Sequence, residues 1–246
     1  MQENEHNTKG HLHPFTILSR KSIDILTKLG FEVASGPELE SEEYNFDKLN
    51  VPKDHPSRDM QDTFWIKGRP DHVLRTHTSP VQVRYMLEND PPLKAITIGR
   101  VYRNEATDAT HEAQFYQLEG LSVAEGVTLA DLKATLKYFF GELFGNDTEV
   151  RFRPSFFPFV EPGVEVDVRC FKCVGAGCGL CKHTGWIEIM GAGMVHPNVL
   201  EASGVDSSKY TGFAFGAGFD RIASSIFQVP DIRLFYSADL RFINQF

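Results

Sequence analysis

Residues 100–120, RVYRNEATDATHEAQFYQLEG, bring ionisable, amide and aromatic side chains together in a segment patterned like a β-hairpin. Period-two alternation places Arg103 and Glu105 on one face of the first strand. It also aligns three side chains on one face of the return strand: Phe115, Gln117 and Glu119. Such a surface offers a guanidinium for phosphate or carboxylate and a flat ring for a base. Cross-strand ion pairs on a solvated face explain the same pattern, so this segment alone leaves both interpretations open.

A glycine-rich segment, GFAFGAGFDR at residues 212–221, predicts a strand, a glycine turn and a helix. Glycines such as Gly216 let another group approach the backbone closely. Arg221 falls at the start of the expected helix, where anions are favoured. The spacing matches neither the dinucleotide-binding fingerprint nor a Walker motif. Taken alone, a glycine turn that only packs against its helix is the simpler explanation.

The segment THTSPVQ, residues 76–82, places hydrogen-bonding groups at the entry of a predicted helix. His77 and Ser79 share strand parity, and Gln82 lies on the first helical turn. Together they suit one wall of a polar pocket. Ser79 followed by proline is also the pattern of a helix N-cap, and we expect Ser79 to serve as that cap.

The run SFFPFVEPG, residues 155–163, is rich in aromatic side chains. Phe157 and Phe159 point to one side of an extended chain, and Val160 follows them. Core packing is the ordinary reason for such a run. Glu161 shares the parity of the two phenylalanines, which is unusual for a purely apolar face.

Helices and strands alternate along the rest of the chain without a regular βαβ rhythm, so the fold class predicted is α+β, an antiparallel sheet flanked by helices. We expect a polar, proline-rich loop over 45–62 and two short strands within 63–77. Helices are predicted at 16–29, 79–87, 128–145 and beyond 218, and Thr128 and Asp131 suit the start of the helix at 128–145. The main strands are predicted within 95–105, 114–124, 150–170, 186–197 and 212–218.

The composition is that of an ordinary globular chain: 246 residues, 41% hydrophobic and 24% charged. That length buries a sizeable core in a single domain. No run approaches the ~18 apolar residues of a membrane span. Residues 1–10, MQENEHNTKG, read as a polar tail without the apolar centre of a signal peptide, which predicts a cytoplasmic protein. The net charge of −8 argues against nucleic-acid binding over the whole surface, but not against a local basic path or a basic partner.

All four cysteines of the chain fall in one segment, CFKCVGAGCGLC. Two CxxC pairs without a secretion signal favour a compact structural zinc site. Reduced or redox-active thiols are the alternative, and disulfides are disfavoured in that setting. The four candidate ligands are Cys170, Cys173, Cys178 and Cys181.

Together these segments resemble one family, the α subunit of bacterial phenylalanyl-tRNA synthetase, a class II aminoacyl-tRNA synthetase. The resemblance runs from residue 13 to 246 through GFEVASGPELE (motif 1), NFDKLNVPKDHPSRDMQDTFW, RTHTSPVQVRYM, GRVYRNEATDATHEAQFYQLEG (motif 2), RFRPSFFPFVEPG, GAGMVHPNVL, GFAFGAGFDRI (motif 3) and DIRLFYSADLRFINQF. It implies one class II catalytic domain over 11–246, with a small four-cysteine insert at 170–181. The N-terminal helical arm that contacts tRNA in this family is expected to be absent.

The resemblance also implies a reaction. The carboxylate of phenylalanine attacks the α-phosphate of ATP, giving phenylalanyl-adenylate and pyrophosphate, and the acyl group then passes to tRNA(Phe). Both reacting groups are anionic, so positioning and charge neutralisation should dominate catalysis. Mg²⁺ is the expected cofactor, and a β subunit is the expected partner in an α2β2 heterotetramer.

Site residues follow from the matched motifs. Arg103 and Arg221 would be catalytic, the first bridging carboxylate and α-phosphate and the second meeting the γ-phosphate. Three further residues would bind ATP. Glu105 would accept from the adenine amino group, His111 would meet the outer phosphates, and Phe115 would stack on the adenine ring. Glu161 would help to hold Mg²⁺, shared with the β subunit.

The phenylalanine pocket is assigned in the same way. Five residues would surround the ammonium and carboxylate: His77, Ser79, Gln82, Gln117 and Glu119. Phe157 and Phe159 would meet the substrate ring edge to face. The pocket floor would be formed by Val160, Ala214 and Gly216.

Two rival functions are also consistent with a class II pattern. One is a non-catalytic paralogue that binds an amino acid or a partner protein. The presence of both Arg103 and Arg221 argues against it, because binding alone needs no pair of phosphate-directed arginines. The other is a synthetase of different specificity, against which Phe157, Phe159 and Ala214 favour phenylalanine.

Overall fold

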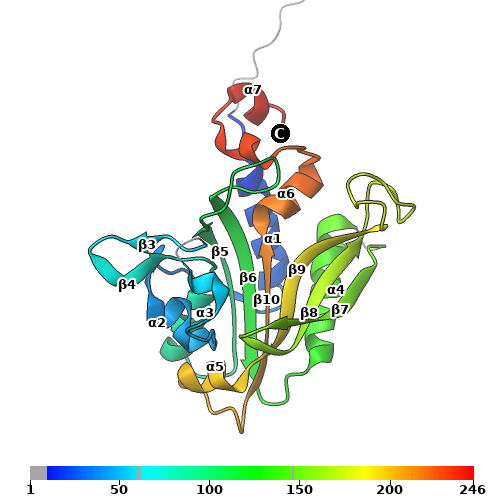
Figure 1. The fold of residues 1–246 in the computed structure, drawn as a ribbon. Coiled ribbons are helices and arrows are strands. Elements are labelled where there is room, and N and C mark those ends of the chain that lie inside the picture. Colours follow the sequence, from blue (N-terminus) through cyan, green and yellow to red (C-terminus); the bar gives the residue numbers. More distant parts are fainter. Residues whose placement is uncertain (1–9, 60–61, 146) are drawn as a thin grey trace, which may run out of the picture.

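The computed structural model describes residues 10–59, 62–145 and 147–246. The predicted polar tail, residues 1–10, therefore lies outside it except for Gly10. Figure 1 shows a long twisted sheet with helices against both of its faces, so the predicted α+β class is confirmed. Within the described ranges, no helix is long and apolar enough to cross a membrane.

The main sheet has seven strands in the order β1-β5-β6-β10-β9-β8-β7. β1 pairs with β5 in parallel, and every other neighbouring pair is antiparallel. The strands are β1 (Glu32–Val33), β5 (Leu93–Tyr102), β6 (Gln114–Ala124), β7 (Val150–Phe157), β8 (Val160–Arg169), β9 (Trp186–Val195) and β10 (Thr211–Gly218). A smaller sheet joins β2 (Leu39–Ser41), β4 (Arg69–Leu74) and β3 (Trp65–Ile66), and β3 and β4 are the two short strands predicted there.

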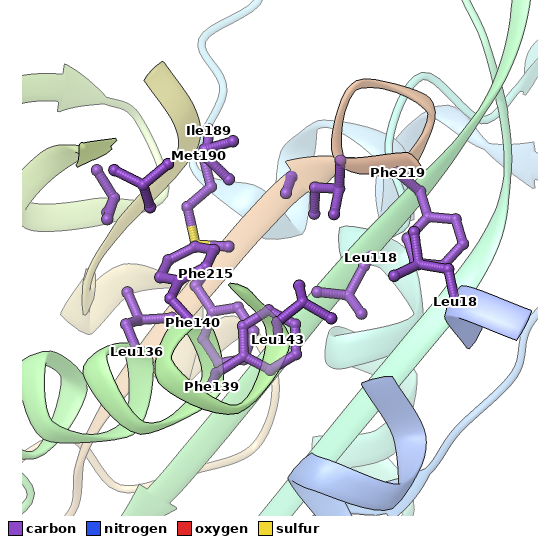
Figure 2. Packing of buried hydrophobic residues seen from close by; sticks show 14 of the residues in the cluster. Leu18, Leu118, Leu136, Phe139, Phe140, Leu143, Ile189, Met190, Phe215 and Phe219 are labelled. Atoms are coloured by element: carbon purple, nitrogen blue, oxygen red, sulfur yellow. The ribbon is translucent and has the colours of Figure 1, made fainter. Parts of the chain in front are cut away.

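Three helices cover one face of the main sheet: α1 (Pro14–Thr27), α4 (Leu129–Phe144) and α6 (Phe219–Phe227). Figure 2 shows Phe139 and Phe140 of α4 packed with Phe215 of β10, and Leu18 of α1 beside Phe219. Burial of such large apolar side chains supplies most of the driving force for folding. This face of the sheet is therefore the core of the molecule.

Other elements lie on the opposite side: α2 (Glu42–Asn45), α3 (Ser79–Glu88), α5 (Pro197–Ala202) and the 3₁₀ turn Asp47–Leu49, with a further 3₁₀ turn, Pro56–Arg58, beside them. They pack on the lower half of β6, around Leu121 and Val123. A third 3₁₀ turn, Ile232–Tyr236, and α7 (Leu240–Ile243) close the C-terminal end. The upper half of β6 on this face is left for a cavity.

The start of α4 matches its predicted cap. Thr128 is the N-cap, and its hydroxyl accepts from the N–H of Asp131 at 3.4 Å, while Asp131 Oδ2 accepts from the N–H of Thr128 at 2.8 Å. This reciprocal capping box satisfies two donors that a helix start leaves unpaired.

The predicted cap of α3 is wrong. Ser79 is the first helical residue, and the N-cap is Thr78, whose side chain makes no capping bond. The Ser79 hydroxyl instead donates to the carboxylate of Glu119 on β6. Leaving a buried carboxylate without hydrogen-bond donors costs more free energy than leaving the helix start without a side-chain cap, because the proline at its second position already favours the helix.

The expectation of an uninterrupted loop over 45–62 is also wrong in part. α2 ends at Asn45, and two 3₁₀ turns follow it. Arg58, only 8% exposed, holds this segment by donating to Glu42 at 2.9 Å and to Asp47 at 2.7 Å. Buried arginine of this kind needs paired acceptors, so the segment folds around it.

Candidate active site

A cavity of about 710 Å³ opens over the upper half of β6 and β10. That volume is typical of a site for a small organic substrate or cofactor. Most of the predicted site residues line it: His77, Ser79, Gln82, Arg103, Glu105, Phe115, Gln117, Glu119, Phe157, Phe159, Val160, Ala214, Gly216 and Arg221. The four segments singled out in the sequence therefore meet at one place.

Glu119 forms the acidic end of the cavity. It is 3% exposed and accepts from the Thr78 N–H at 3.2 Å and from Gln82 Nε2 at 2.7 Å, in addition to the Ser79 hydroxyl. Burial raises the pKa of Glu119 to about 7, although these hydrogen bonds oppose the shift. A cation that binds beside this carboxyl group would stabilise its charged form.

Two further acceptors at this end have no partner within the described ranges: Nδ1 of His77 and Oε1 of Gln117. Burial lowers the pKa of His77 to about 3, and the positive charges of Arg103 and Arg75 add to the effect. His77 is therefore neutral. A neutral imidazole has one acceptor nitrogen, and Nδ1, which has no partner, can fill that role for a ligand. A buried hydrogen-bond acceptor without a partner lowers the stability of the folded protein unless a ligand donates a hydrogen bond to it.

Arg103 lines the same cavity as Glu119 and interacts with its charge. Its Nε donates to the Thr76 carbonyl at 3.2 Å, and its guanidinium carbon lies 5.1 Å from the centre of the Phe115 ring. Burial lowers the pKa of Arg103, opposed by the charges of Glu105 and Glu119, and an arginine keeps its charge under such conditions. The cavity thus presents a fixed cation.

The predicted strand face of Arg103 and Glu105 is wrong. β5 ends at Tyr102, and both residues belong to the connection between β5 and β6. The Arg103 N–H still donates to the Ala113 carbonyl at 2.9 Å, which holds the start of this connection in place. Both side chains reach the cavity from here.

An aromatic pair forms the wall facing β9. The Phe157 and Phe159 rings are nearly parallel, at 15° with centres 6.0 Å apart. Phe157 lies close against Gly191 of β9, where an added Cβ would be 2.8 Å from the ring. The sequence reasoning missed Gly191, although the GAG pattern in β9 was a signal that something approaches this backbone closely.

A charged group at the β8–β9 side of the cavity was also missed. Glu165 and Glu188 line it, and both pair with Arg153, at 2.8 and 3.2 Å. Glu165 and Glu188 could have been found from the sequence, because acidic and apolar residues alternate along VEVDV and WIEI. Such alternation is typical of strands with one polar face.

Two predicted site residues do not line the cavity. His111 is exposed in the β5–β6 connection, where its Nδ1 lies 3.1 Å from Asp108. Glu161 has a side chain that is 76% exposed, with one oxygen 3.4 Å from Nε2 of His196. Among the described residues, the only group of three or more metal-ligating side chains is the cysteine cluster, so a cation at Glu161 needs further ligands from substrates or a partner.

The four cysteines converge outside the cavity, in the connection between β8 and β9. Their sulfur atoms lie within 4.8 Å of one another, and three of the pairs are 3.8 Å apart. A tetrahedral zinc site with Zn–S bonds of about 2.3 Å has sulfur atoms about 3.8 Å apart. Backbone N–H groups of Gly177 and Gly185 point at Sγ of Cys173 and Cys181, which suits thiolates.

Comparison with known proteins finds a single family. The model of the "tRNA synthetases class II core domain (F)" family matches residues 1–246. Phenylalanine–tRNA ligase alpha subunits from Caldanaerobacter subterraneus and Exiguobacterium are 55% and 56% identical, over 96% and 98% of this chain and 69% and 70% of theirs. The chain belongs to the phenylalanine–tRNA ligase alpha-subunit family.

A solved structure shares the fold at far lower identity. Pyrrolysyl-tRNA synthetase from Desulfitobacterium hafniense superposes with a TM-score of 0.68 at 18% identity, covering 94% of this chain and 75% of that one. At this identity the likeness concerns the fold alone. The shared fold agrees with the class II synthetase core that the family model matches.

The raised pKa of Glu119 makes the stability of this protein depend on pH. Between its ordinary value of 4.5 and about 7, the folded protein holds a proton that the unfolded chain releases, so stability falls as pH rises. The neutral isostere Glu119→Gln removes this loss. We expect its free energy of unfolding to gain on wild type by up to about 3 kcal/mol between pH 4.5 and 8.

Denaturant unfolding of both proteins at several pH values measures this difference. Glu161→Gln is the matched control, because Glu161 is exposed and its loss should leave the pH dependence unchanged. Parallel curves for wild type and Glu119→Gln would contradict the assignment.

Proposed function

We propose that this chain is the catalytic α subunit that activates phenylalanine with ATP and transfers it to tRNA(Phe). The observation that carries the proposal is the set of unsatisfied acceptors at one end of a cavity that also holds an aromatic wall and arginines. Family membership supports the same activity and disfavours a non-catalytic role.

The acidic end suits the ammonium group of the amino acid. An ammonium has three N–H donors, and three acceptors await them here: His77 Nδ1, Gln117 Oε1 and the Glu119 carboxylate. Ser79 and Gln82 hold Glu119 in place. A neutral His77 is required for this role, since an imidazolium would repel the ammonium.

The substrate ring would lie against Phe157 and Phe159, with Val160, Ala214 and Gly216 as the floor. Aromatic pairs favour edge-to-face and offset contacts. The neighbours of Ala214 on β10 are apolar, and Gly193 faces it on β9, so these residues offer no side chain to pair with a hydroxyl at the para position. Apolar pockets reject an added hydroxyl by only about 10²-fold, so tyrosine would need removal elsewhere, for which the β subunit is the candidate.

Arg103 would bridge the substrate carboxylate and the α-phosphate of ATP. Bringing two anions together is the main barrier to bond formation, and a fixed cation lowers it without reorganisation. Phe115, beside Arg103, would stack on adenine, while Glu105 accepts from its amino group. The adenylate forms as pyrophosphate leaves, and a ribose hydroxyl of tRNA then takes the acyl group, losing its proton as AMP leaves.

Arg221 and His111 would meet the outer phosphates. Arg221 is exposed at the first turn of α6, where the helix start also favours anions. His111 lies on the exposed β5–β6 connection and would reach the phosphates only when that connection moves toward bound ATP. Glu161 would hold Mg²⁺ together with phosphate oxygens and the partner, and the cation would neutralise phosphate charge.

The assembly and the compartment are part of the proposal. A β subunit in an α2β2 heterotetramer would complete the Mg²⁺ site and remove misactivated amino acids. The compartment we propose is the cytoplasm. Of the predicted domain division, the catalytic domain over 11–246 with its four-cysteine insert at 170–181 remains our proposal.

We also propose that Cys170, Cys173, Cys178 and Cys181 hold a structural zinc ion. The sulfur spacing described above supports it. The ion would fasten the β8–β9 connection, which packs on the core through Phe171, stacked on Phe144 at the end of α4 at 5.9 Å and 6°. The cluster is not part of the cavity, so its role would be stability.

Phenylalanine-dependent ATP–pyrophosphate exchange, with the β subunit present, tests the central proposal. We expect exchange with phenylalanine, and a loss of about 10²-fold or more in Arg103→Ala, because a charge-neutralising donor is removed. Lys67→Ala, which removes an exposed cation outside the cavity lining, should be neutral. Exchange that depends on another amino acid would contradict the assigned specificity, and no exchange at all would contradict the proposed activity.

Ala214→Gly tests the pocket floor. Removing this methyl should open space at the para position and raise kcat/KM for para-chlorophenylalanine relative to phenylalanine by about tenfold or more. Ala217→Gly is the control, because it removes the same methyl from the same strand on the core face. An unchanged substrate ratio in Ala214→Gly would place the para position elsewhere.

Metal analysis of protein purified without chelators tests the zinc site. We expect close to one zinc ion per chain, lost in Cys173→Ser, with a lowered melting temperature because metal binding contributes folding free energy. Four freely titrating thiols without metal would support the redox alternative. Zinc far below one per chain would reject the proposal.

A further inference from the structure

Asp220 is a buried carboxylate that none of the proposed steps uses. It is 3% exposed and is the second residue of α6, immediately before Arg221. Its Oδ2 accepts from the backbone N–H of Tyr116 at 2.7 Å, and its Oδ1 accepts from the hydroxyl of Tyr236. A buried carboxylate is costly to retain unless its contacts serve a purpose.

The Tyr116 contact replaces a missing rung of the sheet. β10 pairs with β6 down to Gly218, opposite Gln117. The residue that would pair with Tyr116 is Phe219, which already belongs to α6. A buried backbone N–H must find another acceptor, and the carboxylate of Asp220 provides it at the point where strand gives way to helix.

The residues on either side of this contact line the cavity. Phe115 and Gln117 flank Tyr116 on β6, and Arg221 follows Asp220 on α6. The helix start has no side-chain cap, because its N-cap is Gly218. A carboxylate in the first turn stabilises such a start through the helix dipole. Asp220 therefore fixes both the β6 backbone and the first turn of α6.

Tyr236 extends the connection to the C-terminal segment. It belongs to the 3₁₀ turn Ile232–Tyr236, and the N–H of Ile232 donates to the Ala109 carbonyl of the β5–β6 connection at 3.1 Å. Burial raises the pKa of Asp220 to about 6, and the bonds from Tyr236 and Tyr116 oppose this rise. The hydroxyl is thus one of two donors that keep the carboxylate satisfied.

We propose that Asp220 is a positioning residue for ATP: by completing the β6 ladder at the strand-to-helix junction, it sets the separation between Phe115 and Arg221. This inference rests on the proposed function, in which those two residues hold the adenine and the γ-phosphate of one nucleotide. At the amino acid end Gln117 adjoins the junction, but Glu119 is held by the start of α3, so phenylalanine binding depends on the junction less than ATP binding does.

Steady-state pyrophosphate exchange by the complex with the β subunit provides the test, together with the Kd of ATP in the absence of phenylalanine. In Asp220→Ala we expect KM and Kd for ATP to rise about tenfold or more, the effect of losing a hydrogen bond to a charged group. KM for phenylalanine should stay within about twofold of wild type, since uniform damage would raise both.

Two conservative variants make the test robust if Asp220→Ala folds poorly. Asp220→Asn keeps an oxygen for the Tyr116 N–H and should restore most of the ATP affinity. Tyr236→Phe leaves that bond but removes the second donor, and should raise KM for ATP about threefold, in line with one lost hydrogen bond. Tyr85→Phe is its matched control, because it removes a phenol donor from Glu32, away from the junction.

The outcomes separate this inference from the proposed function. Absence of phenylalanine-dependent exchange in the wild type refutes the function. Normal exchange with an unchanged KM for ATP in Asp220→Ala refutes the positioning role, as does an equal rise in KM for both substrates. Equal effects of Tyr236→Phe and Tyr85→Phe would likewise overturn it.

Discussion

The burial of one carboxylate, Glu119, governs the arrangement of the candidate site. Its charge has to be met by donors from a different element, and the start of α3 supplies the Thr78 N–H, the Ser79 hydroxyl and Gln82. This requirement fixes α3 against β6. It leaves His77 and Gln117 with shielded acceptors that the described residues do not satisfy. These unsatisfied acceptors and the buried carboxylate concentrate an electrostatic cost in the cavity, which is common where binding needs a prepared environment.

Core and cavity are built from the same strands by their period of two. On β10, Phe213 and Phe215 pack in the core beneath the helices, while Ala214 and Gly216 line the cavity. The ring of Phe215 lies over Gly120 of β6, where an added Cβ would be 2.2 Å from it. Because both faces share one backbone, the packing shown in Figure 2 also fixes where the cavity side chains stand. Rigid strands are a better base for a binding site than loops.

Most secondary-structure elements and most of the cavity residues were predictable from the sequence, but several contacts between distant residues were not. Alternation along β5, β6 and β10 and the capping box of α4 are local signals, and the structure confirms them. The errors share a cause in contacts between distant residues. Ser79 does not cap α3 because the carboxylate of Glu119, on another element, takes its hydroxyl. The loop at 45–62 gains structure because buried Arg58 finds partners on α2 and the following turn. Gly191 matters only because Phe157 folds onto it.

Negative and positive side chains occupy different parts of the cavity, although the chain as a whole has a net charge of −8. Glu119 pairs with Gly216 inside the β6–β10 ladder, Arg103 interacts with the charge of Glu119, and Arg221 lies on α6 beyond the end of that ladder. In the proposed function this order matches the substrates laid end to end: ammonium, carboxylate with α-phosphate, and outer phosphates. A zwitterion entering the other way round would place its carboxylate beside Glu119 and lose Arg103. Like charges at such short range in a shielded site cost several kcal/mol, so the charge order by itself selects the orientation in which the carboxylate can attack.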